Sequence, residues 1–223
     1  MNVADTVSAL LDAGSFRFSR SGWSGAPGTG TRDPGFGGAG VLDAAAGVAF
    51  ETDAAWAHGD ATMIHTPRAV FSAEADGAVM QITPTNERRD IDASHPLWPV
   101  LICLGAPASA LAADDTSGTG ASASFAASLE AARARSPFPI GTPPSRPRNG
   151  LVPCQAALGP DGQIREVSVT WPERRTLLLG PRSLARSALR LETRQYWDVL
   201  AVSDPGCPVP DLPSPVARAL AAS

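Results

Sequence analysis

The sequence has no lysine and few cysteines and histidines, and these shortages exclude several kinds of site. All 18 basic residues are arginine. The three cysteines, Cys103, Cys154 and Cys207, include no Cys-x-x-Cys pair, which argues against a zinc site, and their odd number argues against a disulfide framework. We therefore expect free thiols and no bound metal.

The sequence also lacks a long apolar run. The longest, residues 97–106, contains a proline and is far shorter than the about 20 residues that span a bilayer, so we expect no transmembrane segment. The first residues, MNVADTVSALLDAGS, lack the basic start, the long apolar stretch and the cleavage site of a secretory signal. We expect a cytoplasmic protein, or one of the cell envelope if a signal sequence has been removed.

The net charge of −4 is unevenly distributed. Residues 1–132 hold 15 acidic residues and 6 arginines, whereas residues 133–194 hold 11 arginines and 4 acidic residues. A solvated outer face is the simpler explanation of the basic region, and a basic rim for an anionic head group is the alternative. An acidic chain whose arginines do not alternate with aromatic residues is not expected to bind nucleic acid.

A glycine-rich stretch contains one motif that resembles a cofactor site. Residues 35–40, GFGGAG, match the pattern G-x-G-x-x-G of dinucleotide-binding proteins. That pattern requires a buried strand before it and a helix after it, and the flanking residues suit neither. We predict a glycine-rich loop over residues 25–40 and no cofactor.

Short alternating runs predict several strands and a few helices. The hairpin at residues 151–170 is the clearest, because Pro160 and Gly162 favour a turn between two alternating segments. We expect helices after Asn2 or Asp5 as far as Gly14, from Pro96 or Pro99, from Pro107, over residues 121–135 and over residues 216–222, with a proline-rich loop at 136–149. Further strands are expected at residues 15–23, 40–44, 47–52, 61–66, 68–74, 78–83, 177–179 and 187–198, with a weak one at 89–92.

The order of these elements favours one α+β domain over residues 1–223. Strands follow a first helix, helices occupy the middle, and strands return near the end, with no βαβ alternation and no repeat. We expect one antiparallel sheet.

Several stretches resemble the LolA-like superfamily, in particular lipid-binding lipoproteins of the LppX and LprG type. They include DAGSFRFS after the first helix, GAGVLDAAAGVAFE, DGAVMQITP, IDASHPLWPVLICLGAPASAL, LGPDGQIREVSVT and ALRLETRQYWDVLAVSDPGCPVP. The resemblance implies a curved antiparallel sheet, an incomplete β-barrel, wrapped around short helices with an apolar cavity for a lipid or acyl chain. We recognise neither a signal sequence nor a lipobox cysteine in these residues, since Cys103 is internal and follows Ile102.

A concave apolar pocket of this kind would be lined by large apolar side chains. Simple core packing is the alternative for each of them. The candidates are Phe18, Phe50, Trp56, Phe71, Met80, Trp98, Leu101, Leu104, Trp171 and Trp197.

Three histidines are the candidates for acid or base chemistry. The sequence holds no HExxH or GxSxG motif, and we expect His58 and His95 to be exposed loop residues. His65, on a predicted strand, could point inward with Glu51 or Asp53 as its partner.

Three functions fit these observations. The first is the binding of a hydrophobic small molecule or lipid by burial of apolar surface, without catalysis. The second is an intracellular enzyme, for example a cyclase of a biosynthetic pathway, that folds a flexible hydrophobic substrate in the same cavity with His65 and Glu51 as catalytic residues. The third is a partner-binding domain with a filled core and an exposed apolar patch. The ligand and the oligomeric state are not indicated by the sequence.

Overall fold

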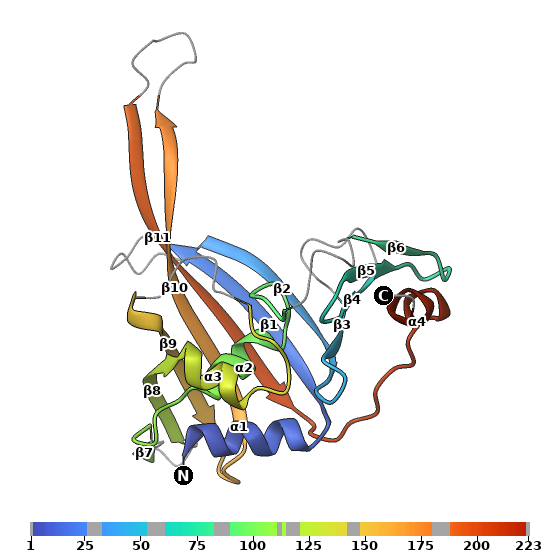
Figure 1. The fold of residues 1–223 in the computed structure, drawn as a ribbon, viewed down its shortest axis with the longest axis horizontal. Helices are drawn as coiled ribbons and strands as arrows, with labels where there is room; N and C mark the ends of the chain where they lie inside the picture. The colour runs from blue at the N-terminus through green and yellow to red at the C-terminus, as the bar shows by residue number, and fades with distance from the viewer. Residues whose placement is uncertain are drawn as a thin grey trace.

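The computed structural model describes residues 2–25, 33–52, 61–82, 90–110, 113–114, 121–141, 148–179 and 188–221. In this part of the chain, 11 strands form one antiparallel sheet in the order β6-β5-β4-β3-β2-β1-β11-β10-β9-β8-β7. The sheet is strongly curved and does not close (Figure 1), so it is an incomplete barrel in an α+β fold. The strands are β1 (Ser15–Gly25), β2 (Asp33–Asp43), β3 (Val48–Thr52), β4 (Thr62–His65), β5 (Val70–Ala73), β6 (Val79–Gln81), β7 (Ala113–Asp114), β8 (Ala121–Ser128), β9 (Leu151–Leu158), β10 (Ile164–Leu179) and β11 (Ala188–Ser203).

Three helices cover one face of the sheet, which we call the inner face. They are α1 (Val3–Asp12), α2 (Trp98–Cys103) and α3 (Leu129–Arg135), and a short 3₁₀ helix, η1 (Arg148–Gly150), precedes β9. Their apolar side chains form one core with alternate residues of the strands, because successive strand residues point to opposite faces. Each large apolar side chain buried in this way contributes about 1.5–3 kcal/mol. The strand residues of this core include Phe16, Phe18, Leu42, Val152, Ile164, Val167, Val169 and Leu200.

A fourth helix, α4 (Ser214–Ala221), packs on the opposite, outer face. Its Val216 joins a second core with Val48, Phe50, Ile64 and Phe71. Figure 1 shows α4 beside the end of the sheet that holds β3 to β6. Strand β3 is therefore buried on both faces, since Ala49 belongs to the inner core and its two neighbours to the outer one.

The first helix begins and ends as its sequence predicts. The Asn2 side chain accepts a hydrogen bond from the Ala4 amide at 2.9 Å, so Asn2 rather than Asp5 is the cap. Gly14, with φ of +81°, turns the chain out of the helix and into β1.

The glycine-rich stretch is a strand, and the prediction of a loop as far as Gly40 was wrong. Strand β2 pairs with β1 through Gly37, Gly38 and Gly40, and Gly40 also pairs with β3. A Cβ at Gly40 would overlap the carbonyl of Phe50, so this glycine allows the backbones to approach.

The predicted helix over residues 121–135 is also partly wrong. Residues 121–128 form β8, which pairs with β9 along its whole length, and only the last seven residues form α3. Alanine favours helices, but pairing with β9 and burial of Ala123 and Ala127 on the inner face override that preference. Ser128 caps α3 by accepting a hydrogen bond from the Ala131 amide. The helix expected from Pro107 is absent from described residues 107–110, which contain only a turn.

The hairpin predicted at residues 151–170 is confirmed and longer than expected. It consists of β9 and β10, and Gly162 in the turn has φ of +76°. Strand β10 continues to Leu179, so the separate strand predicted at 177–179 is its end. Strands β10 and β11 pair over this whole length and extend beyond the other strands (Figure 1).

No helix in the described ranges has the length and apolarity needed to cross a membrane.

Candidate functional site

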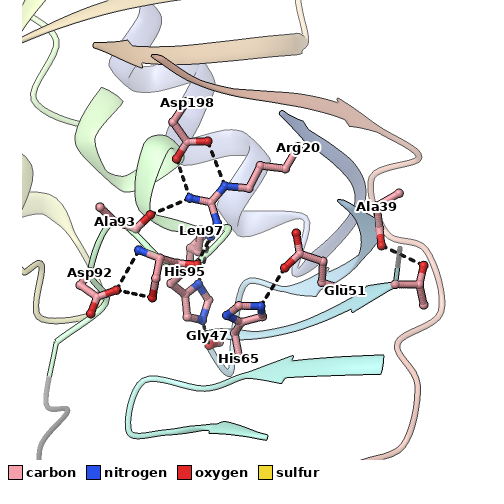
Figure 2. Close-up of polar contacts among 12 residues, drawn as sticks. Arg20, Ala39, Gly47, Glu51, His65, Asp92, Ala93, His95, Leu97 and Asp198 are labelled. Atoms are coloured by element: carbon pink, nitrogen blue, oxygen red, sulfur yellow. Dashed lines mark hydrogen bonds and ion pairs between the residues drawn. The ribbon is translucent and has the colours of Figure 1, made fainter. Parts of the chain in front are cut away.

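Five polar side chains form a buried cluster on the inner face of the sheet (Figure 2). They are Arg20 of β1, Glu51 of β3, His65 of β4, Asp198 of β11 and His95, which lies just before α2. We call this set the polar cluster. Burial of a polar or charged group costs free energy unless the group forms a hydrogen bond or an ion pair, so the stability of the cluster depends on the partners of each side chain.

The ion pair between Arg20 and Asp198 is the centre of the polar cluster. The guanidinium donates from Nε to Oδ1 at 2.9 Å and from one terminal nitrogen to Oδ2 at 2.6 Å, a bidentate geometry. Burial alone would lower the pKa of Arg20, but the charge and hydrogen bonds of Asp198 raise it above its usual value, with smaller contributions from Glu51 and Asp92. Arg20 is therefore a permanent positive charge inside the protein.

Arg20 also ties the chain before α2 to the sheet. Its terminal nitrogens donate to the carbonyls of Ala93 at 2.6 Å and Ser94 at 2.8 Å. These residues belong to a stretch that we call the clamp segment, residues 90–97. At its start, Ile91 forms an isolated bridge with Ile140. The clamp segment is thus held from the sheet on one side and from the loop after α3 on the other.

His95 makes the second connection between the clamp segment and the sheet. The Leu97 amide donates to Nδ1 at 3.0 Å, so that nitrogen carries no hydrogen. The hydrogen of the neutral ring is then on Nε2, which donates to the Gly47 carbonyl at 3.0 Å. His95 is only 1% exposed, so its prediction as an exposed loop residue was wrong. His95 is buried because it lies just before α2 and packs against the turn between β2 and β3, where it donates to the Gly47 carbonyl.

His65 and Glu51 form the third part of the polar cluster. His65 Nε2 lies 2.8 Å from Glu51 Oε2, and the ring centroids of His65 and His95 are 5.7 Å apart. Figure 2 shows the two rings next to each other between Glu51 and the clamp segment. Glu51 is one of the two partners that the sequence suggested for His65, and the other, Asp53, lies outside the described residues. The His65 and Glu51 side chains are both buried, and their catalytic role stays a prediction.

Gly38 makes room for this pair. It lies opposite Arg20 in β2, and a Cβ on it would overlap the carboxylate of Glu51. Sequence reasoning missed Gly38, Arg20 and Asp198. The only signal in the sequence was the high glycine content of residues 35–40, since glycine in a strand often marks the close approach of another group.

The ten side chains predicted to line a cavity fall into separate groups. Phe18, Trp98, Leu101, Leu104 and Trp171 lie together in the inner core. Phe50 and Phe71 lie in the outer core, Met80 is 60% exposed, Trp197 is half-buried, and Trp56 lies outside the described residues, as do Asp53 and His58. Within the inner core, the rings of Trp98 and Trp171 meet edge to face with centroids 5.5 Å apart.

A hollow of about 300 Å³ lies between α1 and the start of β10. Its lining is mainly apolar: the α1 side chains include Ala9 and Leu10, and Ile164 and Pro205 stand across from them. Another hollow, of about 350 Å³, lies on the β1, β2 and β11 region and includes Arg17, Ser19 and Ser203. Of the ten predicted lining residues, Phe18 contributes to the second hollow and none contributes to the first.

The three cysteines are free, as the sequence predicts, and the structure shows that all three are buried. Burial raises the pKa of the Cys154 thiol well above its usual value, and the neighbouring Cys103 side chain raises it further. Among the described residues, no three histidine, cysteine, aspartate or glutamate side chains are grouped as metal ligands.

Comparisons with known proteins find likeness in structure but not in sequence. No family model matches the chain, and no curated protein matches it either. Among solved structures, it is similar to the lipoprotein LppX of Mycobacterium tuberculosis, with 10% identity and a TM-score of 0.42 over 93% of this chain and 97% of that one. It is also similar to a LolA superfamily protein from Nitrosomonas europaea, with 10% identity and a TM-score of 0.30 over 97% of each chain.

Proposed function

We propose that this protein binds a hydrophobic small molecule or lipid between α1 and the curved sheet. The observation that carries the proposal is the apolar hollow of about 300 Å³ beside α1. Ligand sites are typically concave and mainly apolar, with volumes from about 300 Å³ upward. This hollow is at the lower end of that range, so it suits a small ligand or one acyl chain of a larger lipid.

The lining gives this hollow its shape. Leu10 and Ile164 are buried and face the core, which provides an apolar floor. Ala9 and Ala13 carry only methyl groups on the same side of α1, which leaves space above that floor. Asp5 and Gln163 supply the few polar groups at the hollow and can orient a polar end of the ligand.

Burial of apolar surface would supply the affinity. Each buried methylene contributes about 0.8 kcal/mol, which is about a fourfold change in the dissociation constant. For straight-chain carboxylates from hexanoate to dodecanoate, we expect the constant to fall about fourfold per methylene until the hollow is full and then to stop falling. Isothermal titration calorimetry measures the series, and the chain length at the plateau measures the depth of the site.

A pair of variants on α1 tests the location of the site. Ala9→Trp places an indole in the hollow and should weaken binding at least about tenfold. Ser8→Trp adds the same side chain beside it, outside the lining, and should leave binding close to wild type. Mass spectrometry of molecules extracted from protein purified from its native host should find an apolar molecule in wild type and Ser8→Trp but not in Ala9→Trp. Equal retention by all three proteins would contradict this site.

An intracellular enzyme, for example a cyclase, is the second candidate, and the contact between His65 and Glu51 favours it. A carboxylate beside an imidazole is a common acid and base arrangement. With the extracted molecule in hand, His65→Ala distinguishes the candidates. A binding protein keeps its affinity nearly intact, whereas an acid or base catalyst loses about a hundredfold or more of its turnover. The cytoplasmic location of such an enzyme also stays a prediction.

A further inference from the structure

We propose that His95 is an acid-sensitive tether, and that protonation of its ring releases the clamp segment and the start of α2 from the sheet. Through one imidazole, His95 joins the turn between β2 and β3 to the first amide of the α2 region. This response belongs to the fold itself and holds whether or not a ligand is bound.

The hydrogen bond that His95 Nδ1 accepts from the Leu97 amide requires a neutral ring, whereas the bond that Nε2 donates to the Gly47 carbonyl does not. An imidazolium carries hydrogen on both nitrogens, so protonated Nδ1 would face the Leu97 amide donor-to-donor and lose that bond. Because the ring is buried, water does not replace the lost partner without some opening of the clamp segment. Leu97, the N-cap residue of α2, makes no side-chain capping hydrogen bond, so the loss falls on a helix start that has no such cap.

Charged groups of both signs lie around His95. Arg20 of β1 brings a permanent positive charge to the carbonyls of Ala93 and Ser94, next to His95 in the chain. The surrounding carboxylates are engaged by other groups: Asp198 of β11 by Arg20, Glu51 of β3 by His65, and Asp92 of the clamp segment by Ser94. The hydrogen-bond partners of Glu51 and Asp92 do not cancel the charges of these carboxylates, so the exclusion of a proton from His95 rests on the Nδ1 contact and on burial.

The neighbouring His65 has the opposite chemistry. Its ring meets a carboxylate rather than a carbonyl, so a protonated His65 forms an ion pair with Glu51. At 5.7 Å between ring centroids, a positive His65 adds to the repulsion felt by a positive His95. The two histidines of the polar cluster therefore differ: acid strengthens the contact of His65 with Glu51 and breaks the contact of His95 with the Leu97 amide.

The direction of the pH dependence follows from proton counting. A histidine in an unfolded or opened segment titrates near about pH 6.5. Above that value both forms are neutral and the tether has its full strength. Below it, the opened form takes up a proton that the closed form excludes, so the ratio of open to closed rises about tenfold per pH unit.

Hydrogen exchange of the ligand-free full chain, read by mass spectrometry, tests the tether. From about pH 7.5 to about pH 5.5, after correction for the intrinsic exchange rate, opening of peptides over residues 90–104 should rise about tenfold per unit below pH 6.5. Peptides from β9, residues 151–158, provide the internal reference and should not change. A flat profile at residues 90–104, or an equal rise in both regions, would overturn the proposal.

Variants assign the response to one ring. His95→Gln retains a donor for the Gly47 carbonyl and cannot be charged, so its profile should be flat; His95→Asn retains an acceptor for the Leu97 amide and serves if the first variant does not fold. His58→Gln should keep the tenfold slope, and His65→Gln, which removes the repulsion between the two rings, should lower the slope without abolishing it. If the slope persists without His95, or disappears with either control, the tether is not His95.

Discussion

The two faces of strand β1 carry the same kind of ion pair in opposite surroundings. On the outer face, Arg17 meets Asp204 at 3.2 Å, with side chains 57% and 59% exposed. On the inner face, Arg20 meets Asp198 at 2.6 Å, with side chains 3% and 0% exposed. In water an ion pair is weakened by solvation and salt, whereas in the interior each charge depends on its partner. The same two residue types therefore have different roles on the two faces.

The inner pair fixes the position of the clamp segment, and its net contribution to the free energy of unfolding is small. A buried ion pair gains little over an apolar pair of the same volume, because both charges lose their hydration. Arg20, however, also fixes the carbonyls of the clamp segment, and those contacts are directional. The apolar contacts of Trp98 and Leu101 hold α2 on the sheet, and the polar cluster determines where along the sheet α2 begins.

Removal of one inner partner should have the largest effect. Asp198→Ala leaves the Arg20 charge buried without its carboxylate and should lower the free energy of unfolding by about 3–5 kcal/mol. Urea unfolding at neutral pH, followed by tryptophan fluorescence, measures the loss. The double variant Arg20→Met with Asp198→Leu removes both charges and should recover much of it. If Asp198→Ala unfolds with a free energy within about 1 kcal/mol of wild type, the buried Arg20 charge does not need its carboxylate partner.

A methyl group on β2 should have the next largest effect, because it reaches the same polar cluster from the neighbouring strand. Gly38→Ala places a Cβ against the Glu51 carboxylate and should cost about 1–3 kcal/mol as that side chain is displaced from His65. Gly37→Ala is the matched control, because its Cβ would lie 3.4 Å from the Arg20 carbonyl, an ordinary contact. Equal urea midpoints for the two variants would mean that the inner face tolerates the methyl group as well as the outer one does.

The sequence could predict those parts of the fold that depend on neighbouring residues. The turn at residues 159–162 and the cap at Asn2 are local, and both are confirmed. The predicted contact between His65 and Glu51 is also present, because the two lie on adjacent strands only 14 positions apart.

The remaining parts depend on residues far apart in the chain. Arg20 and Asp198 are 178 positions apart, and nothing near either of them indicates the other. Strands β2 and β8 have glycine- and alanine-rich sequences, and only pairing with their neighbours makes them strands. His95 was expected to be an exposed loop residue, but it is buried against Gly47, which is 48 positions away in the chain.

The outer pair should show the smallest effect, and it completes the comparison. Arg17→Ala removes the partner of Asp204 but leaves that carboxylate in water, so the free energy of unfolding should change by less than about 1 kcal/mol. Any difference from wild type should shrink further as salt is added, because the pair is accessible to counterions. The same urea titration at low and high salt measures both effects. A loss as large as that of Asp198→Ala, or one that salt does not reduce, would mean that exposure does not explain the contrast between the two arginines of β1.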